Sequence, residues 1–306
     1  MIKIAYKTNL GIFYNGKIED ALRSKKFDKY RGKTSLIFTS PPFPLNRKKK
    51  YGNLQGEEYI EWIKSLSKDL GELLAPDGSI VIEVGNSWEP GVPVMSTLAL
   101  KSLLAFLEEG EYHLCQQFIW NNTAKLPTPA QWVNIDRTRV KDSFTYIWWM
   151  SKTPNPKANN KHVLIEYSPS MKKLLQNGSY NSGTRPSEHS IGEKSFLSNN
   201  NGAIPSNVIS SANTHSGTPY QLYCKEHSLQ PHPARMPTSL VEFFVKFLTE
   251  EGDLVLDPFG GSNTTGSVSE ELNRRWVSIE PNENYIMGSK GRFKCFNSAE
   301  LEKSQG

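Results

Sequence analysis

The sequence predicts an α/β protein whose central sheet is mostly parallel and covered by helices on both faces. Two observations predict this fold. Short apolar runs typical of buried strands alternate with segments of helical periodicity, and the segment LDPFGGSNTTG (256–266) turns sharply on glycines after one such run. The chain has 306 residues, of which 37% are hydrophobic, which is enough for one large α/β domain or for that domain with a smaller one.

The first half of the chain contains four predicted strands and two predicted helices. Each predicted strand is a short apolar run, and each predicted helix repeats its apolar residues every three or four positions. The strands are at 34–39, 79–85, 114–120 and 144–150, and the helices are at 57–74 and 96–108.

The composition changes at about residue 152. Residues 153–231 are rich in Asn, Ser, Gly and Pro and are too polar to build a layered core. Two interpretations remain open: a linker, or an irregular recognition region, since loops commonly carry function. The alternating order then returns, with helices at 239–248 and 266–272 and strands at 253–259 and 274–282. These changes predict three parts, 1–151, 152–230 and 231–306.

Charge and cysteine content narrow the class of protein. Lys and Arg number 36 against 31 Asp and Glu, an excess that permits an anionic partner without requiring one. Cys115, Cys224 and Cys295 are isolated, so no zinc spacing or disulfide framework is predicted, and no metal is expected. No apolar stretch is long enough for a signal peptide or a membrane span, so the cytoplasm is the expected compartment.

The glycine turn has the features of a cofactor seat. Gly260 and Gly261 let the backbone approach a ligand without a Cβ, and the following helix start offers unpaired N–H groups that suit a carboxylate or phosphate. Glu280 ends the next predicted strand, where it can accept hydrogen bonds from two ribose hydroxyls. Ser267 stands where a phosphate loop has Lys, and G-x-G-x-x-G is absent. The turn therefore favours a cofactor with an amino-acid tail and an adenosine; a purely structural turn is the alternative.

The tetrad Ser40-Pro41-Pro42-Phe43 follows the first predicted strand and suits a flat ring that carries an amino group. The lone pair of such an amine is delocalised into the ring, so an enzyme that alkylates it has to accept hydrogen bonds from its N–H groups. Ser40 offers one acceptor, and the carbonyl of Pro41, held rigid by the two prolines, offers a second. Phe43 offers a face on which an extruded base can stack. A serine hydroxyl is too weak an acid to ionise at neutral pH, so it is not a convincing base. We assign Ser40 to orientation and charge stabilisation, with the proton leaving to water. A turn without chemistry is the alternative.

A basic run, Arg47-Lys48-Lys49-Lys50, lies just beyond the tetrad. Such runs are commonly solvated loops. Beside a base pocket, however, they are placed where phosphates have to pass, and we predict DNA contact here.

Together these motifs resemble the beta-class amino-methyltransferases of DNA, in which the catalytic motif precedes the cofactor motif. A tetrad that opens with serine resembles the N4-cytosine branch, whereas the N6-adenine branch more often opens with Asp or Asn. The resemblance covers most of the chain and is carried by the segments TSPPFPLNRKKKYGN, KLPTPAQWVN, RVKDSFTYIWWMSKT, TRPSEHSIG, HPARMP and FGGSNTTG.

The resemblance implies a seven-stranded methyltransferase sheet, S-adenosylmethionine as methyl donor and double-stranded DNA as substrate. It implies that residues 1–151 are the catalytic half and 231–306 the cofactor-binding half of one domain. Residues 152–230, with Arg185, correspond to the target recognition region. Asp257 and the glycine turn would hold the methionine part of the cofactor, and Glu280 the ribose. The residues assigned to the cofactor are Asp257, Phe259, Gly260, Gly261, Ser262, Asn263, Thr264, Thr265, Glu280 and Arg235.

One position departs from the family pattern. Relatives carry an acidic residue directly after the glycine of NGKIEDAL, but here Lys17 follows that glycine, and Asp20 is a candidate substitute. Glu83, at the end of its strand, is either a partner of Ser40 or a capped strand end.

The predicted function is methylation of the N4 amino group of a flipped-out cytosine at specific DNA sites, as the protective partner of a restriction endonuclease. Two alternatives remain: an N6-adenine enzyme of the same fold, and a catalytically silent DNA-binding module. The intact tetrad and glycine turn argue against the silent module, which needs neither.

Overall fold

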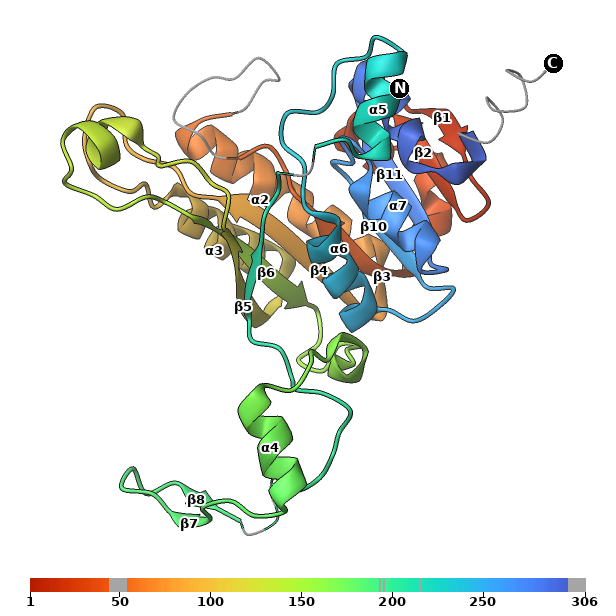
Figure 1. The fold of residues 1–306 in the computed structure, drawn as a ribbon. Coiled ribbons are helices and arrows are strands. Elements are labelled where there is room, and N and C mark those ends of the chain that lie inside the picture. The colour runs from red at the N-terminus through yellow and green to blue at the C-terminus, as the bar shows by residue number, and fades with distance from the viewer. Residues whose placement is uncertain (44–53, 193, 195, 215, 297–306) are drawn as a thin grey trace. The chain divides into compact units, whose positions relative to one another are not determined.

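The computed structural model describes residues 1–43, 54–192, 194, 196–214 and 216–296 (Figure 1). The basic run at 47–50 lies outside the described residues. The chain divides into two compact units, one formed by Met1–Ala158 with Asn207–Gly306 and the other by Asn159–Ser206. No helix in the described part of the chain combines the length and the apolar character that a bilayer crossing needs.

The first unit is built on a nine-stranded sheet with the order β1-β2-β11-β10-β3-β4-β6-β5-β9. The run from β2 to β4 is parallel, whereas β6 is antiparallel to both β4 and β5. Its strands are β1 (Lys3–Lys7), β2 (Gly11–Asn15), β3 (Thr34–Thr39), β4 (Leu74–Gly85), β5 (His113–Asn122), β6 (Phe144–Ser151), β9 (Val208–Ser211), β10 (Leu254–Asp257) and β11 (Arg275–Glu280).

The predicted fold class is confirmed, but the predicted count of seven strands is wrong for the described chain. The two additional strands are at the sheet edges, where β1 pairs antiparallel with β2 and β9 pairs parallel with β5. An edge strand pairs on one side only and needs less apolar sequence, so the composition of 152–230 concealed β9.

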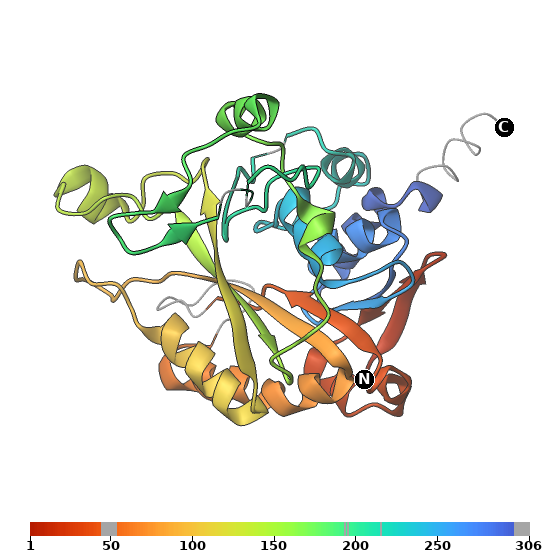
Figure 2. The same cartoon turned by 90° about the horizontal axis from the view of Figure 1, so that it is seen from below.

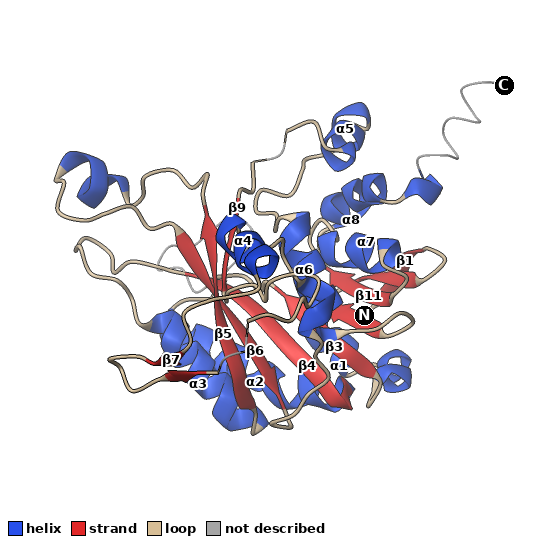
Figure 3. Ribbon diagram, turned by 60° about the horizontal axis from the view of Figure 1, so that its bottom comes forward, coloured by secondary structure: helices blue, strands red, loops and turns tan. Residues whose placement is uncertain are grey.

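Helices cover both faces of this sheet, as Figures 2 and 3 show. Alternate residues of β3 point to opposite faces: Ile37 packs with α2 and α3, whereas Leu36 and Phe38 pack with α6 and α7. The helices of this unit are α1 (Ile18–Leu22), α2 (Gly56–Leu73), α3 (Leu98–Gly110), α5 (Pro219–Glu226), α6 (Thr238–Leu248), α7 (Thr264–Glu271) and α8 (Glu283–Ser289), with single turns η1 (Lys25–Tyr30), η2 (Gln131–Ile135) and η4 (Lys290–Arg292). The strands and helices predicted from periodicity are all present.

The second unit is small and polar. It contains η3 (Asn160–Val163), α4 (Pro169–Asn177) and a two-stranded hairpin of β7 (Gly183–Thr184) and β8 (Ser190–Ile191). The hydroxyl of Ser168 caps α4 by accepting a hydrogen bond from the backbone N–H of Met171. The role of the second unit in target recognition stays a prediction.

Candidate active site

The carboxyl ends of β3 and β10 lie side by side. The two strands are parallel neighbours, with Leu36 opposite Val255 and Ile37 opposite Leu256. Thr39 donates a hydrogen bond of 2.7 Å from Oγ1 to Oδ1 of Asp257. The S-P-P-F tetrad and the glycine turn therefore begin at adjacent points of one sheet edge, where open α/β sheets bind their ligands.

Asp257 connects this edge to helix α7. Its Oδ2 accepts a hydrogen bond of 2.7 Å from Oγ1 of Thr265, and its Oδ1 accepts a second bond, of 3.1 Å, from the backbone N–H of Phe259. The side chain is only 2% exposed, and burial raises the pKa of its carboxyl above the ordinary value, against the hydroxyls of Thr265 and Thr39. The carboxyl thus fixes the geometry of the turn.

The glycine turn is closely packed on both sides. Gly261 has φ +49, and a Cβ there would be 3.2 Å from Nε2 of His232. A Cβ on Gly260 would be 3.1 Å from the ring of Phe13 and from Cβ of Ser278. A side chain at either glycine would therefore crowd these neighbours, and at Gly261 it would also have to adopt a left-handed backbone conformation.

Asn263 holds the turn from within. It is fully buried in the left-handed region at φ 56, and its Oδ1 accepts from the N–H of Gly266 at 3.1 Å and from Oγ of Ser278 at 2.7 Å. Its Nδ2 donates to the hydroxyl of Tyr6 at 3.0 Å. The side chain of this predicted cofactor residue is thus engaged in bonds within the protein.

Glu280 lies against the same turn. Its Oε2 accepts from the backbone N–H of Gly261 at 3.0 Å, and its Oε1 accepts from that of Asn282 at 2.9 Å. Burial raises the pKa of Glu280 to about 7, against these two hydrogen bonds. Each carboxylate oxygen keeps a lone pair for a further donor.

Ser40 and Glu83 form a hydrogen bond, which is the first of the two interpretations of Glu83 given above. Oγ of Ser40 donates to Oε2 of Glu83 at 2.6 Å. Glu83 is 2% exposed, and its Oε1 has no hydrogen-bond partner among the described residues. Burial raises the pKa of Glu83, against the hydrogen bond from Ser40. The hydroxyl of Thr145, which is also buried without a partner among the described residues, lowers the pKa of the same carboxyl, as the hydroxyl of Ser40 does.

Phe43 lies on the end of β4. A Cβ added to Gly85 would be 2.5 Å from Cε2 of the Phe43 ring, so the absence of a side chain at Gly85 makes room for that ring. The predicted stacking residue is therefore held beside the strand that carries Glu83.

Two residues outside the HPARMP segment, Tyr220 and Arg292, lie around the turn, and the sequence did not reveal either of them. Arg292 donates from Nε to the carbonyl of Ser262 at 2.6 Å and from a terminal nitrogen to its Oγ at 2.9 Å. Burial lowers the pKa of Arg292 to about 10. The guanidinium carbons of Arg292 and Arg235 lie 4.7 and 5.6 Å from the ring centroid of Tyr220. Tyr220 in turn accepts from the backbone N–H of His232 at 2.7 Å. No local motif marks Tyr220 or Arg292, so sequence reasoning missed both.

Asp20, the candidate substitute for the family's displaced acidic residue, and its neighbour Glu19 make different contacts. Asp20 is bound by the N-terminal ammonium of Met1 at 2.9 Å. Glu19 instead accepts from the indole N–H of Trp62 at 2.8 Å, and that indole lies 5.5 Å from the ring of Phe259 in the glycine turn. Of the two carboxylates, Glu19 is the one connected to the glycine turn, through Trp62 and Phe259.

The predicted DNA residues are only partly described. Residues 47–50 lie outside the described chain. Arg185, in the second unit, donates from its guanidinium to the carbonyl of Asn181 at 2.7 Å. Its contact with DNA stays a prediction.

The residues around the turn fit an adenosine cofactor with an amino-acid tail. The two glycines let the turn pack closely against His232 and Ser278, Glu280 offers acceptors for ribose hydroxyls, and Nδ1 of His232 is buried without a partner among the described residues. In the described part of the chain, no group of three or more His, Cys, Asp or Glu is placed to hold a metal. A sheet of this order with these two motifs at one edge defines the class of Rossmann-like methyltransferases.

Comparison with known proteins supports this class. The DNA methylase family matches residues 34–290, and the chain belongs to this family. The chain is 43% identical over 300 residues to the type II methyltransferase M.PvuII of Proteus hauseri, an alignment that spans 97% of this chain and 88% of the relative. The motifs quoted above resemble the PvuII type in particular, and this relative confirms that resemblance.

Comparison with solved structures also supports this class of protein. The chain is similar to the structure of the cytosine-N4-specific PvuII DNA methyltransferase, with a TM-score of 0.76 and 37% identity over 95% of this chain and 89% of that one. It also shares its fold with the M1.HpyAVI–SAM complex, with a TM-score of 0.53 and 20% identity over 92% of this chain and 99% of that one.

Proposed function

We propose that this chain transfers a methyl group from S-adenosylmethionine to the exocyclic N4 amino group of a cytosine turned out of duplex DNA. The observation that carries the proposal is the hydrogen bond between Thr39 and Asp257, which places the tetrad and the glycine turn at one edge. The similarity to a cytosine-N4-specific enzyme over nearly the whole chain favours N4 of cytosine over N6 of adenine.

The cofactor supplies a methyl group on a positively charged sulfur. We assign its methionine part to the glycine turn at the start of α7, because this turn resembles the cofactor motif of the family. Glu280 would accept from the ribose hydroxyls. His232 and Arg235, on the segment packed against Gly261, would cover this end of the site.

Ser40 would orient the target amine. Its only hydrogen is directed to Glu83, so its oxygen lone pairs are free to accept from an N–H of the base. The carbonyl of Pro41 would accept from the second N–H, and Phe43 would stack on the ring. Two acceptors on one amino group draw its nitrogen toward tetrahedral geometry and expose its lone pair for in-line attack at about 3–3.5 Å. The proton then leaves to water.

The test is product analysis. DNA of varied sequence is incubated with the protein and labelled S-adenosylmethionine, digested to nucleosides and separated. The expected product is N4-methylcytosine. A product of N6-methyladenine or 5-methylcytosine would overturn the assignment. Calorimetry with S-adenosylmethionine addresses the silent-module alternative, because a silent module has no need to bind it.

Two further features belong to the proposal. We infer that the protein protects DNA against a cognate restriction endonuclease, since its relative M.PvuII is a type II methyltransferase. We also infer that it acts in the cytoplasm, where its DNA substrate is found. Survival of cells that express the endonuclease only when this protein is present would support the pairing.

A further inference from the structure

The β5–β6 loop, defined as residues 123–143, emerges at the catalytic edge of the sheet. Since β6 is antiparallel to β4, the loop begins and ends beside the end of β4, the strand that carries Glu83. The root of the loop is fixed there by Asp142, whose carboxylate accepts from Nδ2 of Asn86 at 2.9 Å and lies 3.4 Å from Nζ of Lys125. The position of the loop relative to the site is therefore set by hydrogen bonds.

This loop exposes apolar side chains to an unusual degree. Val140 is 86% exposed, Leu126 75% and Ile135 68%. Among the large hydrophobic residues that the structure describes, only Met1 is more exposed than Val140. Figure 1 shows the loop projecting from the sheet with a helical turn, η2, along its course. Single exposed aliphatic residues are ordinary, but several on one projecting loop indicate a binding surface.

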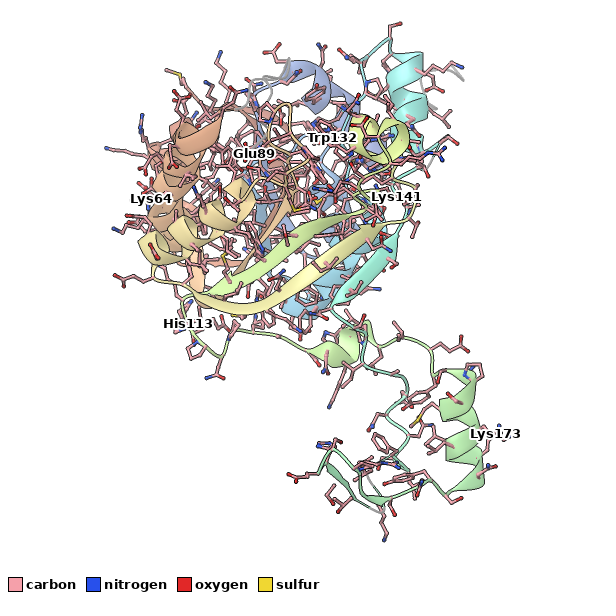
Figure 4. The ribbon with its side chains drawn as sticks, turned by 90° about the vertical axis from the view of Figure 1, so that its left-hand side faces the viewer. Lys64, Glu89, His113, Trp132, Lys141 and Lys173 are labelled. Carbon is pink, nitrogen blue, oxygen red and sulfur yellow. The ribbon has the colours of Figure 1, made fainter. Side chains whose placement is uncertain are left out.

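Residues 86–97, which follow β4, extend the exposed apolar surface of the β5–β6 loop. Arg139 donates from Nε to the carbonyl of Pro93 at 3.1 Å, which joins the β5–β6 loop to residues 86–97 after β4. Figure 4 shows Trp132 and Lys141 at the same end of this unit as Glu89 of that segment. Val92 and Val94 are also exposed there.

The charge of the loop suits a polyanion. Residues 123–143 contain four Lys or Arg against two Asp. Both carboxylates are engaged: Asp136 accepts from the amide of Gln131 at 2.9 Å, and Asp142 is held at the root. Arg139 and Lys141 flank Val140 in sequence, so cationic groups adjoin the most exposed apolar side chain of the loop. Cations with apolar side chains between them are the pattern of proteins that hold phosphates and insert into the base stack.

We propose that the β5–β6 loop enters a groove of duplex DNA and that Val140 fills the space left by the extruded cytosine. The inference rests on the proposed function, because only an enzyme that turns a base out of the helix leaves such a space. Val140 is two residues from Asp142, whose anchor follows β4, so it is held near the base pocket. Its methyl groups would replace the stacking contacts that the neighbouring bases lose.

The test compares two duplexes that carry the site found by sequencing methylated DNA from cells expressing the protein. In one the target cytosine is paired, and in the other it lies opposite an abasic nucleotide. Val140→Ser is expected to lower kcat/KM about tenfold on the paired duplex and no more than about twofold on the other, since extrusion of an unpaired base costs less. The matched control is Leu104→Ser, at an exposed position of α3, which is expected to behave as the unaltered protein does on both duplexes.

An equal loss on both duplexes, or no loss on the paired one, would overturn the inference. Calorimetry with S-adenosylmethionine verifies that each variant is folded. If Val140→Ser does not bind the cofactor, Val140→Ala is measured in the same way, with the same expectation. Should the unaltered protein methylate neither duplex while it binds the cofactor, the proposed function fails and this inference fails with it.

Discussion

The hydroxyl of Thr39 and the carboxylate of Asp257 are joined by a hydrogen bond of 2.7 Å, although 218 positions separate them in the chain. This bond connects the last residue of β3 to the last residue of β10. It gives the two motifs a fixed spacing that does not depend on the long segment between them. The position of the two motifs relative to each other is therefore set within the sheet.

We expect Asp257→Asn to weaken cofactor binding and to lower the free energy of unfolding by about 1–3 kcal/mol. An asparagine cannot accept from Thr39, Phe259 and Thr265 at once, so a buried donor loses its partner. Calorimetry with S-adenosylmethionine and urea unfolding measure the two effects.

The matched control is Asp253→Asn, just before the other end of β10. Asp253 pairs with Lys157 at 2.9 Å, away from the glycine turn. Its loss is expected to leave cofactor affinity unchanged. Equal cofactor affinities in the two variants would contradict the role assigned to Asp257.

Ser40→Ala is expected to lower kcat by about a hundredfold and to leave the affinity for S-adenosylmethionine unchanged, because the hydroxyl acts on the base. Glu83→Gln should lower kcat less. Its amide can still bond to Ser40, but the carbonyl oxygen is a weaker acceptor than a carboxylate. Single-turnover methylation of a duplex with its site measures both. Unchanged turnover in Ser40→Ala would remove that hydroxyl from the mechanism.

The residues that sequence reasoning located are those marked by local chemistry. Ser40 and Gly261 stand in motifs whose turns require their residue types, and periodicity was enough to place β3 and α2. Glu83 could be proposed as a partner of Ser40 because neighbouring parallel strands end at one edge of a sheet. The structure confirms that contact.

The residues that sequence reasoning missed act through tertiary contacts. Arg292 reaches Ser262 from 30 positions away, and Tyr220 lies in a segment too polar to predict as ordered. Neither residue stands in a pattern of spacing. Asn263 was assigned to the cofactor because it lies within the cofactor motif. Its side chain, however, bonds to Tyr6 and Ser278 inside the fold.

That role of Asn263 leads to a prediction about stability. Asn263→Ala removes three buried hydrogen bonds and leaves a Cβ in the left-handed region, whereas Asn263→Gly removes the same bonds without that strain. We expect Ala to lower the free energy of unfolding by about 3 kcal/mol or more, and Gly by about 1 kcal/mol less than Ala. Urea unfolding of the pair tests this. If Ala proves no less stable than Gly, backbone strain at position 263 is unimportant.

The pKa of Glu280 predicts how stability depends on pH. In the folded protein this carboxyl keeps its proton up to pH about 7, whereas its ordinary pKa is 4.5. Between these values the folded state binds more protons than the unfolded chain, so the contribution to stability is full below about pH 4.5 and is lost as pH rises through about 7. Glu280→Gln cannot ionise. As pH rises from 5 to about 8, the variant should therefore become more stable relative to the unaltered protein, as measured by the free energies of unfolding of the two proteins.

The ionisation of Glu280 predicts the opposite pH dependence for cofactor affinity, which should rise with pH. Ribose hydroxyls donate to the ionised carboxylate more strongly than to the neutral acid, so affinity for S-adenosylmethionine should rise between pH 6 and about pH 8. The amino group of the cofactor titrates in every variant, and Glu280→Gln removes only the part that comes from Glu280. Calorimetry at several pH values compares the two proteins. An identical pH profile in both would show that Glu280 does not titrate against the cofactor, and the assignment of ribose binding to its carboxylate would have to be given up.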